Sequence, residues 1–568
     1  MALNGRAHRT GSRKDVSLTR QQIGTMIADG WTIIIVDGDV LRLDAWLKYH
    51  PGGEKTIMHM VGRDATDEVN ALHSIDTRSR MARFRIGRVD GRWSNFVPPI
   101  QGGLFTSHVD QDDITANMKG GDITETSSQS ESSASSPMFD PVDRTTDFAL
   151  RGPGGQSFDL ETSSISSVST VESDQHHGSP KLALKDAYTQ KEIDLDLAKY
   201  PPLDATTQDD IVRRYRLLHH RIIAEGLFQC NYKAYLIELC RYTALFGICL
   251  GCLHLGWYGT SGLFLGLFWH QLVFTAHDAG HMGITHDFTM DTIIGIVIAD
   301  FLGGLSLGWW KQSHNVHHIV TNSPEHDPDI EHMPFLAVSH RFFESLRSTY
   351  YNRIMKYDAF AKFTIRYQNY LYYPILTLGR FNLYRLSWEY LILGLGPKRG
   401  PAWWHRWFEI AGHIFFWTWF GYALMYKAIP TAGDRILFLL VSHMVTAPLH
   451  VQITLSHFAM STADLGIHES FPQKMLRTTM DVDCPEWLDF LHGGLQFQAI
   501  HHLYPRIPRH NLRRTQKLVQ EFCREVGIPY ALFGFVDGNK EVIGKLRDVG
   551  RQAAILAECQ RHVATKSD

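Results

Sequence analysis

Long apolar runs divide the chain into a polar N-terminal part and an apolar C-terminal part. They occupy residues 235–255, 262–275, 291–310, 410–428 and 436–455. A helix needs about 20 mostly apolar residues to cross a bilayer. Four of the runs therefore predict membrane-crossing helices, the run at 262–275 only marginally. The run at 291–310 contains Asp300 and several glycines, and we expect it to be embedded without crossing.

The polar part begins with a segment, residues 17–96, that has the pattern of a small α+β domain. A helical segment follows Thr19, and the run Trp-Thr-Ile-Ile-Ile-Val-Asp at 31–37 predicts a β-strand. Residues with branched β-carbons are enriched in strands. Gly38 and Asp39 then predict a turn.

Residues 104–190 have a different composition and predict a disordered linker. The stretches 124–136 and 162–173 are almost wholly Ser, Thr, Glu and Gln. So few apolar groups cannot offset the entropy lost when a chain folds. We therefore expect a flexible tether between the first domain and a third region at 200–560.

The third region opens with an amphipathic helix. Its apolar positions recur at helical spacing beside several arginines: Ile211, Tyr215, Leu218 and Ile222, with Arg213, Arg214, Arg216 and Arg221. Such a helix suits the surface of an anionic membrane.

Charge and cysteine content narrow the classes of function. The net charge of −3 over 568 residues gives no global basis for binding nucleic acid. The seven cysteines are scattered and suggest no disulfide framework. Cys249 and Cys252 form a Cys-x-x-Cys pair inside an apolar run, where they are better interpreted as small packing residues. The first 15 residues have no apolar core, so we expect no cleaved signal peptide.

Basic residues predict the orientation in the membrane. Residues 311–406, between the two pairs of apolar runs, contain many of them: Arg341, Arg347, Arg353, Lys356, Arg366, Arg380, Arg385, Lys398 and Arg399. The tips of the two apolar hairpins hold chiefly Lys427 and Arg435. Cytosolic loops of membrane proteins are rich in Lys and Arg. We expect this loop and both termini to be cytosolic.

Two histidines in the first domain are candidate heme ligands. His50 begins the tetrapeptide His-Pro-Gly-Gly, and His73 follows 23 residues later. Two imidazoles on opposite sides of a heme leave no open iron position, an arrangement suited to electron transfer. Glycines allow a sharp backbone turn where a Cβ would collide with the porphyrin. The tetrapeptide alone could equally be an ordinary surface turn.

Three histidine clusters stand at the ends of apolar segments and predict a metal centre. The seven box histidines are His277 and His281 in the first box, His314, His317 and His318 in the second, and His501 and His502 in the third. Imidazoles suit iron that changes oxidation state while positions stay free for oxygen. One iron cannot use seven histidines, so the boxes imply two.

The boxes also constrain the topology, because their ligands must meet on one side of the membrane. An even number of crossings must separate any two boxes. The run at 291–310 lies between the first and second boxes and therefore should not cross. Four transmembrane helices result, with the metals at the cytosolic face.

The residues around the candidate heme ligands resemble the cytochrome b5 family over about 80 residues. The resemblance rests on Leu-Asp-Ala-Trp-Leu at 43–47 and Gly-Arg-Asp-Ala-Thr-Asp-Glu at 62–68. It implies a heme b held by His50 and His73.

The box set resembles the membrane fatty acyl and sphingolipid desaturases over about residues 235–525. Gln498 as the first residue of the third box, with an N-terminal cytochrome b5, resembles the front-end subgroup. That subgroup normally shows Gln-Ile-Glu-His-His, whereas Ala499 and Ile500 leave out the glutamate here. The resemblance implies a further histidine ligand, best matched by His457, with His450 as the alternative. Gln498 is a candidate ligand or a residue that orients one.

Among the subgroups, the chain is most similar to fungal sphingolipid 8-(E)-desaturases. The similarity lies in residues 449–458, 480–487 and Leu-Tyr-Pro-Arg after the third box, and in the long Ser-rich insertion. It implies a ceramide long-chain base as substrate and a double bond between carbons 8 and 9. The chain would then be a multi-pass protein, expected in the endoplasmic reticulum, that contacts membrane lipids and binds no nucleic acid.

The predicted reaction removes two hydrogens from an unactivated methylene pair with O2. It needs two further electrons, supplied singly through the heme. The chain has no nicotinamide or flavin fingerprint, so the electrons should come from NADH through a separate cytochrome b5 reductase. A front-end desaturase of acyl lipid or acyl-CoA and a hydroxylase share every metal motif and remain alternatives. A non-enzymatic heme-and-metal membrane protein is the alternative of a different class.

Overall fold

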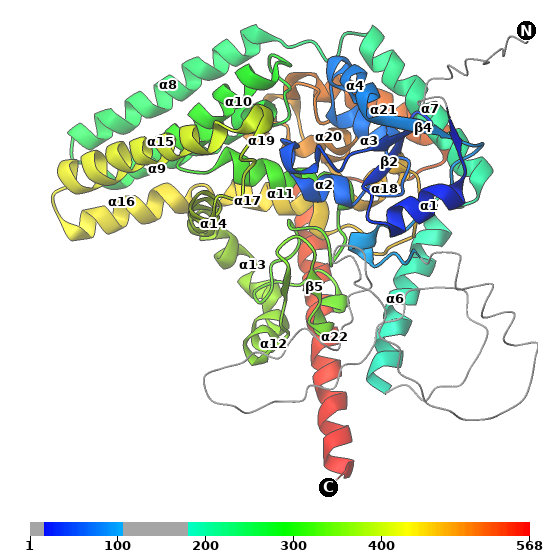
Figure 1. Cartoon of the computed structure of the whole chain (residues 1–568). Coiled ribbons are helices and arrows are strands. Elements are labelled where there is room, and N and C mark those ends of the chain that lie inside the picture. Colours follow the sequence, from blue (N-terminus) through cyan, green and yellow to red (C-terminus); the bar gives the residue numbers. More distant parts are fainter. Residues whose placement is uncertain (1–15, 106–179, 568) are drawn as a thin grey trace, which may run out of the picture. The chain divides into compact units, whose positions relative to one another are not determined.

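The computed structural model describes residues 16–105 and 180–567 (Figure 1). Their contacts divide the described chain into two compact units. Of the described residues, one unit draws on 16–44, 58–65, 81–105 and 180–183, and the other on 45–57, 66–80 and 184–567. Most of the predicted linker, residues 106–179, lies outside the described residues.

The first unit is built on a four-stranded sheet in the order β1-β4-β3-β2. The strands are β1 (Ser17–Leu18), β2 (Ile33–Val36), β3 (Asp39–Arg42) and β4 (Arg85–Val89). The predicted strand is confirmed, and the turn lies one residue earlier than predicted, since Asp37 and Gly38 join β2 to β3 with positive φ angles of 51° and 77° and Asp39 already begins β3. Two such residues make the tight turn whose twist matches a hairpin.

Helix α1 (Arg20–Ala28) covers the apolar side of this unit. Thr19 caps its first turn, and Gln22 completes the reciprocal capping box. Ile23 and Ile27 face inward and pack with Ile33 of β2 in a buried cluster. The short helix η2 (Ala82–Phe84) precedes β4, and η3 (Pro99–Gln101) follows it.

The second unit contains four short helices that flank the candidate heme ligands. They are η1 (Leu47–Tyr49), α2 (Glu54–Met58), α3 (Thr66–Leu72) and α4 (Ile75–Met81). The unit then continues from α6 (Pro180–Lys199) onward. Because α6 starts at Pro180, the last residues of the predicted linker are helical, and the expectation of disorder up to residue 190 is wrong at that end.

Helix α7 (Ala205–Ala224) is the predicted amphipathic helix, but its apolar face does not meet lipid. Ile211 and Ile222 are buried in a cluster with Val519 of α21 (Leu512–Val526). The Tyr215 hydroxyl donates a hydrogen bond to the backbone oxygen of Leu503 at 2.9 Å. The face is turned into the protein, so the prediction of a membrane-surface helix is wrong.

The long apolar helices form a layered bundle. Helix α9 (Tyr258–Gly280) packs between α8 (Tyr232–His254) and α16 (Ala432–Met444), as Figure 1 shows. Helix α15 (His405–Phe416) continues into the π-helical segment η7 (Trp417–Ala428), and α17 (Ala447–Phe458) follows α16. Their shared core is rich in aromatic rings, including Trp269, Phe416 and Phe420.

Fewer than four described helices satisfy the length and apolarity of a membrane span. Tyr232–His254 and Ala432–Phe458 satisfy both, and Phe288–Leu302 with Leu307–Val320 could count as a third, bent by 117°. The bent pair comprises α10 (Phe288–Ile296), η4 (Val297–Leu302) and α11 (Leu307–Val320). The pair contains the run at 291–310, which we expected to be embedded without crossing. A bend of this size is compatible with a segment that enters the membrane and turns back.

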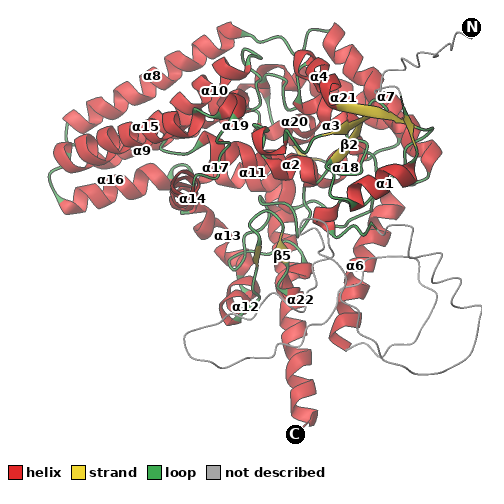
Figure 2. Ribbon diagram, viewed as in Figure 1, coloured by secondary structure: helices red, strands yellow, loops and turns green. Residues whose placement is uncertain are grey.

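The remaining elements are mostly helical (Figure 2). Between α11 and α15 lie η5 (His340–Glu344), β5 (Arg347–Ser348), β6 (Arg353–Ile354), α12 (Ala359–Arg366), α13 (Gln368–Thr377), α14 (Gly379–Leu393) and η6 (Gly400–Ala402). After α17 come α18 (Phe471–Thr478), β7 (Asp481–Asp483), η8 (Glu486–Leu488), α19 (Asp489–His492), η9 (Leu495–Phe497), α20 (Gln498–Leu503), η10 (Arg509–Asn511), α21, β8 (Leu532–Gly534) and α22 (Phe535–Ser567). The predicted helical architecture holds apart from two short strand pairs, antiparallel β5–β6 and parallel β7–β8.

Candidate metal and heme sites

The three boxes lie at the C-terminal ends of three helices. His277 is in the last turn of α9, and His281 follows as its C-cap residue. The second box is on the C-terminal half of α11, and the third ends α20. His457 is in the last turn of α17.

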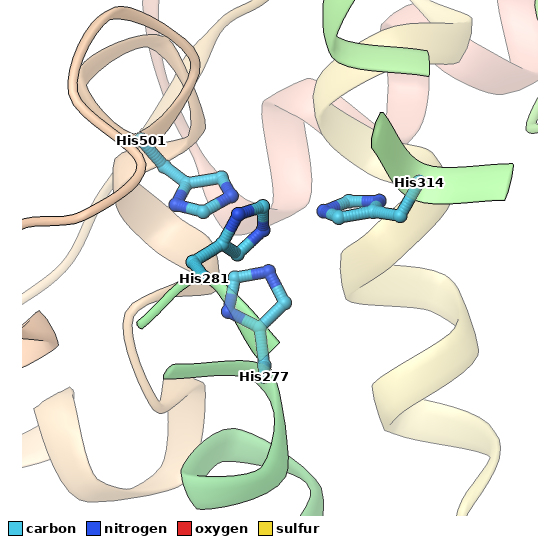
Figure 3. Close-up of side chains that lie close together, drawn as sticks. All are labelled: His277, His281, His314 and His501. Carbon is cyan, nitrogen blue, oxygen red and sulfur yellow. The ribbon is translucent and has the colours of Figure 1, made fainter. Parts of the chain in front are cut away.

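Four histidines from these elements form the first group. The ligand atoms of His277, His281, His314 and His501 all lie within 4.8 Å of one another. Figure 3 shows the four imidazole rings turned toward one another. The ring centroids of His277 and His501 are 4.5 Å apart, and those of His281 and His314 are 5.0 Å apart. This spacing suits several imidazoles around one ion.

A second group contains His317, His457 and His502, again with ligand atoms within 4.8 Å of one another. The Nε2 atoms of His317 and His502 are 3.2 Å apart. His318 lies between the groups, since its ring centroid is 4.8 Å from that of His501 and 4.3 Å from that of His502. The structure therefore brings together all seven box histidines and His457.

The chemistry of these side chains fits metal ions. The Nε2 atoms of His281 and His501 are buried and have no hydrogen-bond partner in the described protein. An unsatisfied buried polar atom costs about 1–3 kcal/mol, which a bound ion would offset. Burial, and then neighbouring imidazoles, keep the pKa of His501 and of His502 well below its ordinary value. Both rings are therefore neutral and can offer a lone pair.

A buried ion-pair network joins the first box to the segment after the third. Asp278, between the box histidines, accepts a hydrogen bond from the Arg509 guanidinium, which also pairs with Glu238 of α8. The Arg509 side chain is only 5% exposed. Trp310 of α11 stacks on His314 with ring centroids 4.6 Å apart. These contacts restrict where the two helix ends can lie.

The N-terminus of α11 is held by acidic side chains from other elements. Asp300 of η4 accepts from the backbone N–H of Leu307 at 3.3 Å, and Glu409 of α15 accepts from that of Gly308 at 3.1 Å. Ser306 accepts from the N–H of Trp309 at 3.0 Å. The first N–H groups of a helix lack partners within it. The acidic residue in the predicted embedded run thus anchors the helix that carries the second box.

The two candidates for the extra histidine have different positions. His457 belongs to the second group, whereas His450 packs beside Gly379, on another part of α17. Gln498 is buried at the start of α20, where Asp481 of β7 accepts from the backbone N–H of Ala499 at 2.8 Å. A role for Gln498 in binding metal stays a prediction.

Two carboxylates beside the boxes were not predicted from the sequence. Asp329 lies within 4.8 Å of the ligand atoms of His314 and His317, and Asp327 contacts His317 directly. Both belong to the His-Asp-Pro-Asp run at 326–329, shortly after the second box. The position of two acids so close to a histidine cluster is the feature of the sequence that could have identified them.

The candidate heme ligands face each other with ring centroids 6.0 Å apart. Nδ1 of His50 donates to the backbone oxygen of Gly53 at 2.8 Å, and Nδ1 of His73 donates to that of Val69 at 3.2 Å. Each Nε2 is therefore left as the ligating atom. Burial, and then the nearby His50, lower the pKa of His73 to about 3, so this ring is neutral.

Glycine is required beside His50, as the sequence predicted. A Cβ on Gly52 would lie 2.8 Å from Cε1 of the His50 ring, and Gly53 has a φ of 88°. A side chain at either position would disturb the ring or strain the backbone. The residues present therefore fit a heme held by two histidines.

Comparison with known proteins finds two family models that match this chain. Residues 255–534 match the model of the fatty acid desaturase family, and residues 19–90 match that of the cytochrome b5-like heme/steroid binding domain. The chain is 65% identical to a delta 8-(E)-sphingolipid desaturase of Emericella nidulans, covering 97% of each chain. It is 48% identical to one from Kluyveromyces lactis, covering 96% of this chain and 94% of the relative. An acyl-lipid (9-3)-desaturase of Borago officinalis is 35% identical over 66% of this chain and 82% of its own.

Proposed function

We propose that this chain, which belongs to the cytochrome b5-fused family of fatty acid desaturases, introduces the 8-(E) double bond into the long-chain base of a ceramide. The observation that carries the proposal is the 65% identity to a desaturase of that description over nearly the whole of both chains. The converging histidines support the chemistry, because they offer the metal ligands that such a reaction requires.

The proposed metal ligands are the histidines of the two groups with His318 between them. Two iron ions bound there would supply the oxygen-dependent removal of hydrogens from an unactivated methylene pair. The protein's part is to hold neutral imidazoles in place and to keep the site largely closed to water, since His281 and His501 are each only 4% exposed. The buried Arg509 network and the anchored start of α11 preserve this arrangement.

Electrons are proposed to reach the site through a heme b held by His50 and His73, one at a time. The source is NADH, through a separate cytochrome b5 reductase. The chain is proposed to lie in the endoplasmic reticulum membrane with four crossings, and its heme and metals to face the cytosol.

One alternative substrate class has support of its own. The Borago officinalis relative is named as an acyl-lipid desaturase, so a front-end desaturation of acyl chains shares this architecture. A hydroxylase would use the same ligands and leave an alcohol in place of the alkene.

Expression in a yeast host that lacks sphingoid-base unsaturation separates these reactions. Mass spectrometry of the lipids should show a long-chain base lighter by two hydrogens, with the double bond placed between carbons 8 and 9. An unsaturated acyl chain with a saturated base would support the acyl alternative, and a base heavier by one oxygen would support the hydroxylase. Substituting His277 with alanine should abolish the product, whereas His254→Ala, at the exposed end of α8, should not.

A further inference from the structure

The loop that follows the second box contacts every histidine of the second group. Helix α11 ends at Val320, and the chain turns at Asn322, whose φ is 59°. Asparagine tolerates this left-handed conformation better than most residues. The turn directs residues 321–329 back along the metal-binding end of α11.

Asp327 contacts the first of these histidines, His317. Its two carboxylate oxygens each lie 2.9 Å from Nδ1 of His317, so this ring nitrogen carries the proton and donates it. The same carboxylate accepts from the backbone N–H groups of Asn322 at 2.7 Å and Asp329 at 2.8 Å. Asp327 is fully buried. Its contacts fix the ring of His317 with Nε2 toward the metal position.

Asn322 contacts the segment that carries the second histidine, His457. Its side-chain amide donates to the backbone oxygen of His457 at 2.9 Å and to those of Ser461 and Thr478, both at 3.2 Å. One side chain thereby joins the end of α17 and the end of α18 to the loop. The backbone of His457 cannot shift without breaking these bonds.

Thr321 contacts the third histidine, His502. Its hydroxyl donates to the backbone oxygen of His317 at 2.7 Å and lies 3.3 Å from Nδ1 of His502. A hydroxyl has one proton to donate, so it accepts from the protonated Nδ1 of His502. Nε2 of His502 is then free to bind metal.

The first group is oriented by other residues. Asp278 is adjacent to His277 and is held by Arg509, and Asp329 lies 3.5 Å from Nδ1 of His314. The two groups therefore have largely different supporting contacts, which meet at Asp327, because the backbone N–H of Asp329 donates to it at 2.8 Å.

We propose that Thr321, Asn322 and Asp327 are positioning residues for one of the two metal positions, so that changing them alters the occupancy and environment of that position more than those of the other. The inference rests on the proposed di-iron function and deepens it. Partners that orient metal-bound histidines are typically worth 10–100-fold in metal affinity, which gives the size of the expected effect.

Asp327→Asn is the decisive variant. An amide presents one oxygen where the carboxylate presents two, so either a backbone N–H or the ring N–H of His317 loses its acceptor. In purified full-length protein loaded with Mössbauer-active iron, the signal of one iron position should weaken or shift, and metal affinity there should fall about 10–100-fold. The signal of the other position should change less, because its only link to Asp327 among the contacts described above runs through Asp329 and His314. Asp327→Glu should partly restore the altered signal.

Glu325→Gln is the matched control, because Glu325 lies in the same loop but pairs with Arg341. It should leave both iron signals as in the unsubstituted protein. Asn322→Gly keeps the left-handed turn and removes only the amide contacts, and it should perturb the same position as Asp327→Asn. Thermal unfolding of each variant measures whether the fold survives.

The outcomes separate this inference from the proposed function. If unsubstituted protein bound fewer than two irons outside heme, the proposed function would fail. If it bound two, and Asp327→Asn left both signals unchanged or altered both alike in a folded protein, the loop would have no selective role and the inference would be overturned.

Discussion

At the residue scale, the candidate heme site and the candidate metal site differ in the group that accepts a hydrogen bond from Nδ1 of the histidine, the ring nitrogen that faces away from the metal position. Nδ1 of His50 and of His73 donates to a backbone oxygen. Nδ1 of His317 donates to the Asp327 carboxylate. A carboxylate partner makes an imidazole a more basic ligand than a carbonyl partner does. If iron binds in these groups as proposed, His317 would be a more basic ligand than either candidate heme histidine.

The heme ligands should be separable from the metal ligands by mutation. His50→Ala or His73→Ala removes one of the two proposed axial ligands, so heme absorbance should disappear and product formation in cells should stop. Iron bound outside heme should persist, because its ligands are other residues. Optical spectra and metal analysis of the same preparation measure both quantities. Desaturation that survived without heme would mean that free cytochrome b5 replaces the fused domain.

The box histidines and Gln498 should differ in their effect on iron. Alanine at His281, His317 or His501 removes a buried ligand and should lower both iron content and product to background. Gln498→Ala should reduce turnover more than iron content, because an amide orients a neighbour or binds metal only weakly. Iron per protein, measured beside product from a defined ceramide, tests the contrast. Equal losses of iron in all four variants would make Gln498 a full ligand.

At the element scale, the position of α9 depends on a bond network that no single helix contains. Arg509 pairs with Asp278 of α9 and Glu238 of α8. Arg509→Ala would leave two buried carboxylates without their cation, and breaking such a pair costs about 3–5 kcal/mol. The midpoint of thermal unfolding in detergent should fall clearly, and iron content should fall with it.

Arg514→Ala is the control for that prediction. The Arg514 side chain is 65% exposed, and its nearest acid, Glu225, is 3.8 Å away. Exposed pairs contribute about 0–1 kcal/mol, so this variant should unfold close to the temperature of the unsubstituted protein. Similar destabilisation by both substitutions would contradict the importance assigned to the buried network.

At the scale of the whole molecule, the four crossings that we propose would place the tips of both apolar hairpins in the lumen. An Asn-x-Thr glycosylation site inserted between Ala432 and Gly433 should then be modified in cells. The same site inserted after Gly400 should stay unmodified, because the proposed topology puts the loop between α11 and α15 on the cytosolic side. A shift in gel mobility that glycosidase reverses measures the result. Modification of the Gly400 insertion would reverse the predicted orientation.

The sequence predicted which histidines come together better than it predicted their surroundings. Box spacing identified the seven histidines, and the resemblance added His457, because these depend on residue type and local position. The packing of the apolar face of α7 against the protein was not predicted, because periodicity shows which face of a helix is apolar but not what covers that face. Asp327 was missed because its contact with His317 depends on a turn at Asn322 that no hydrophobic pattern records.

The arrangement of the boxes at helix ends has an electrostatic consequence. Helices α9, α11 and α17 all present their C-terminal ends to the metal positions. Each such end carries roughly half a negative charge from aligned peptide dipoles. The backbone therefore attracts cations before any side chain binds them, which compensates for ligands that are neutral imidazoles. This field does not distinguish iron from other divalent metals, so the identity of the bound ion depends on ligand geometry and on metal supply in the cell.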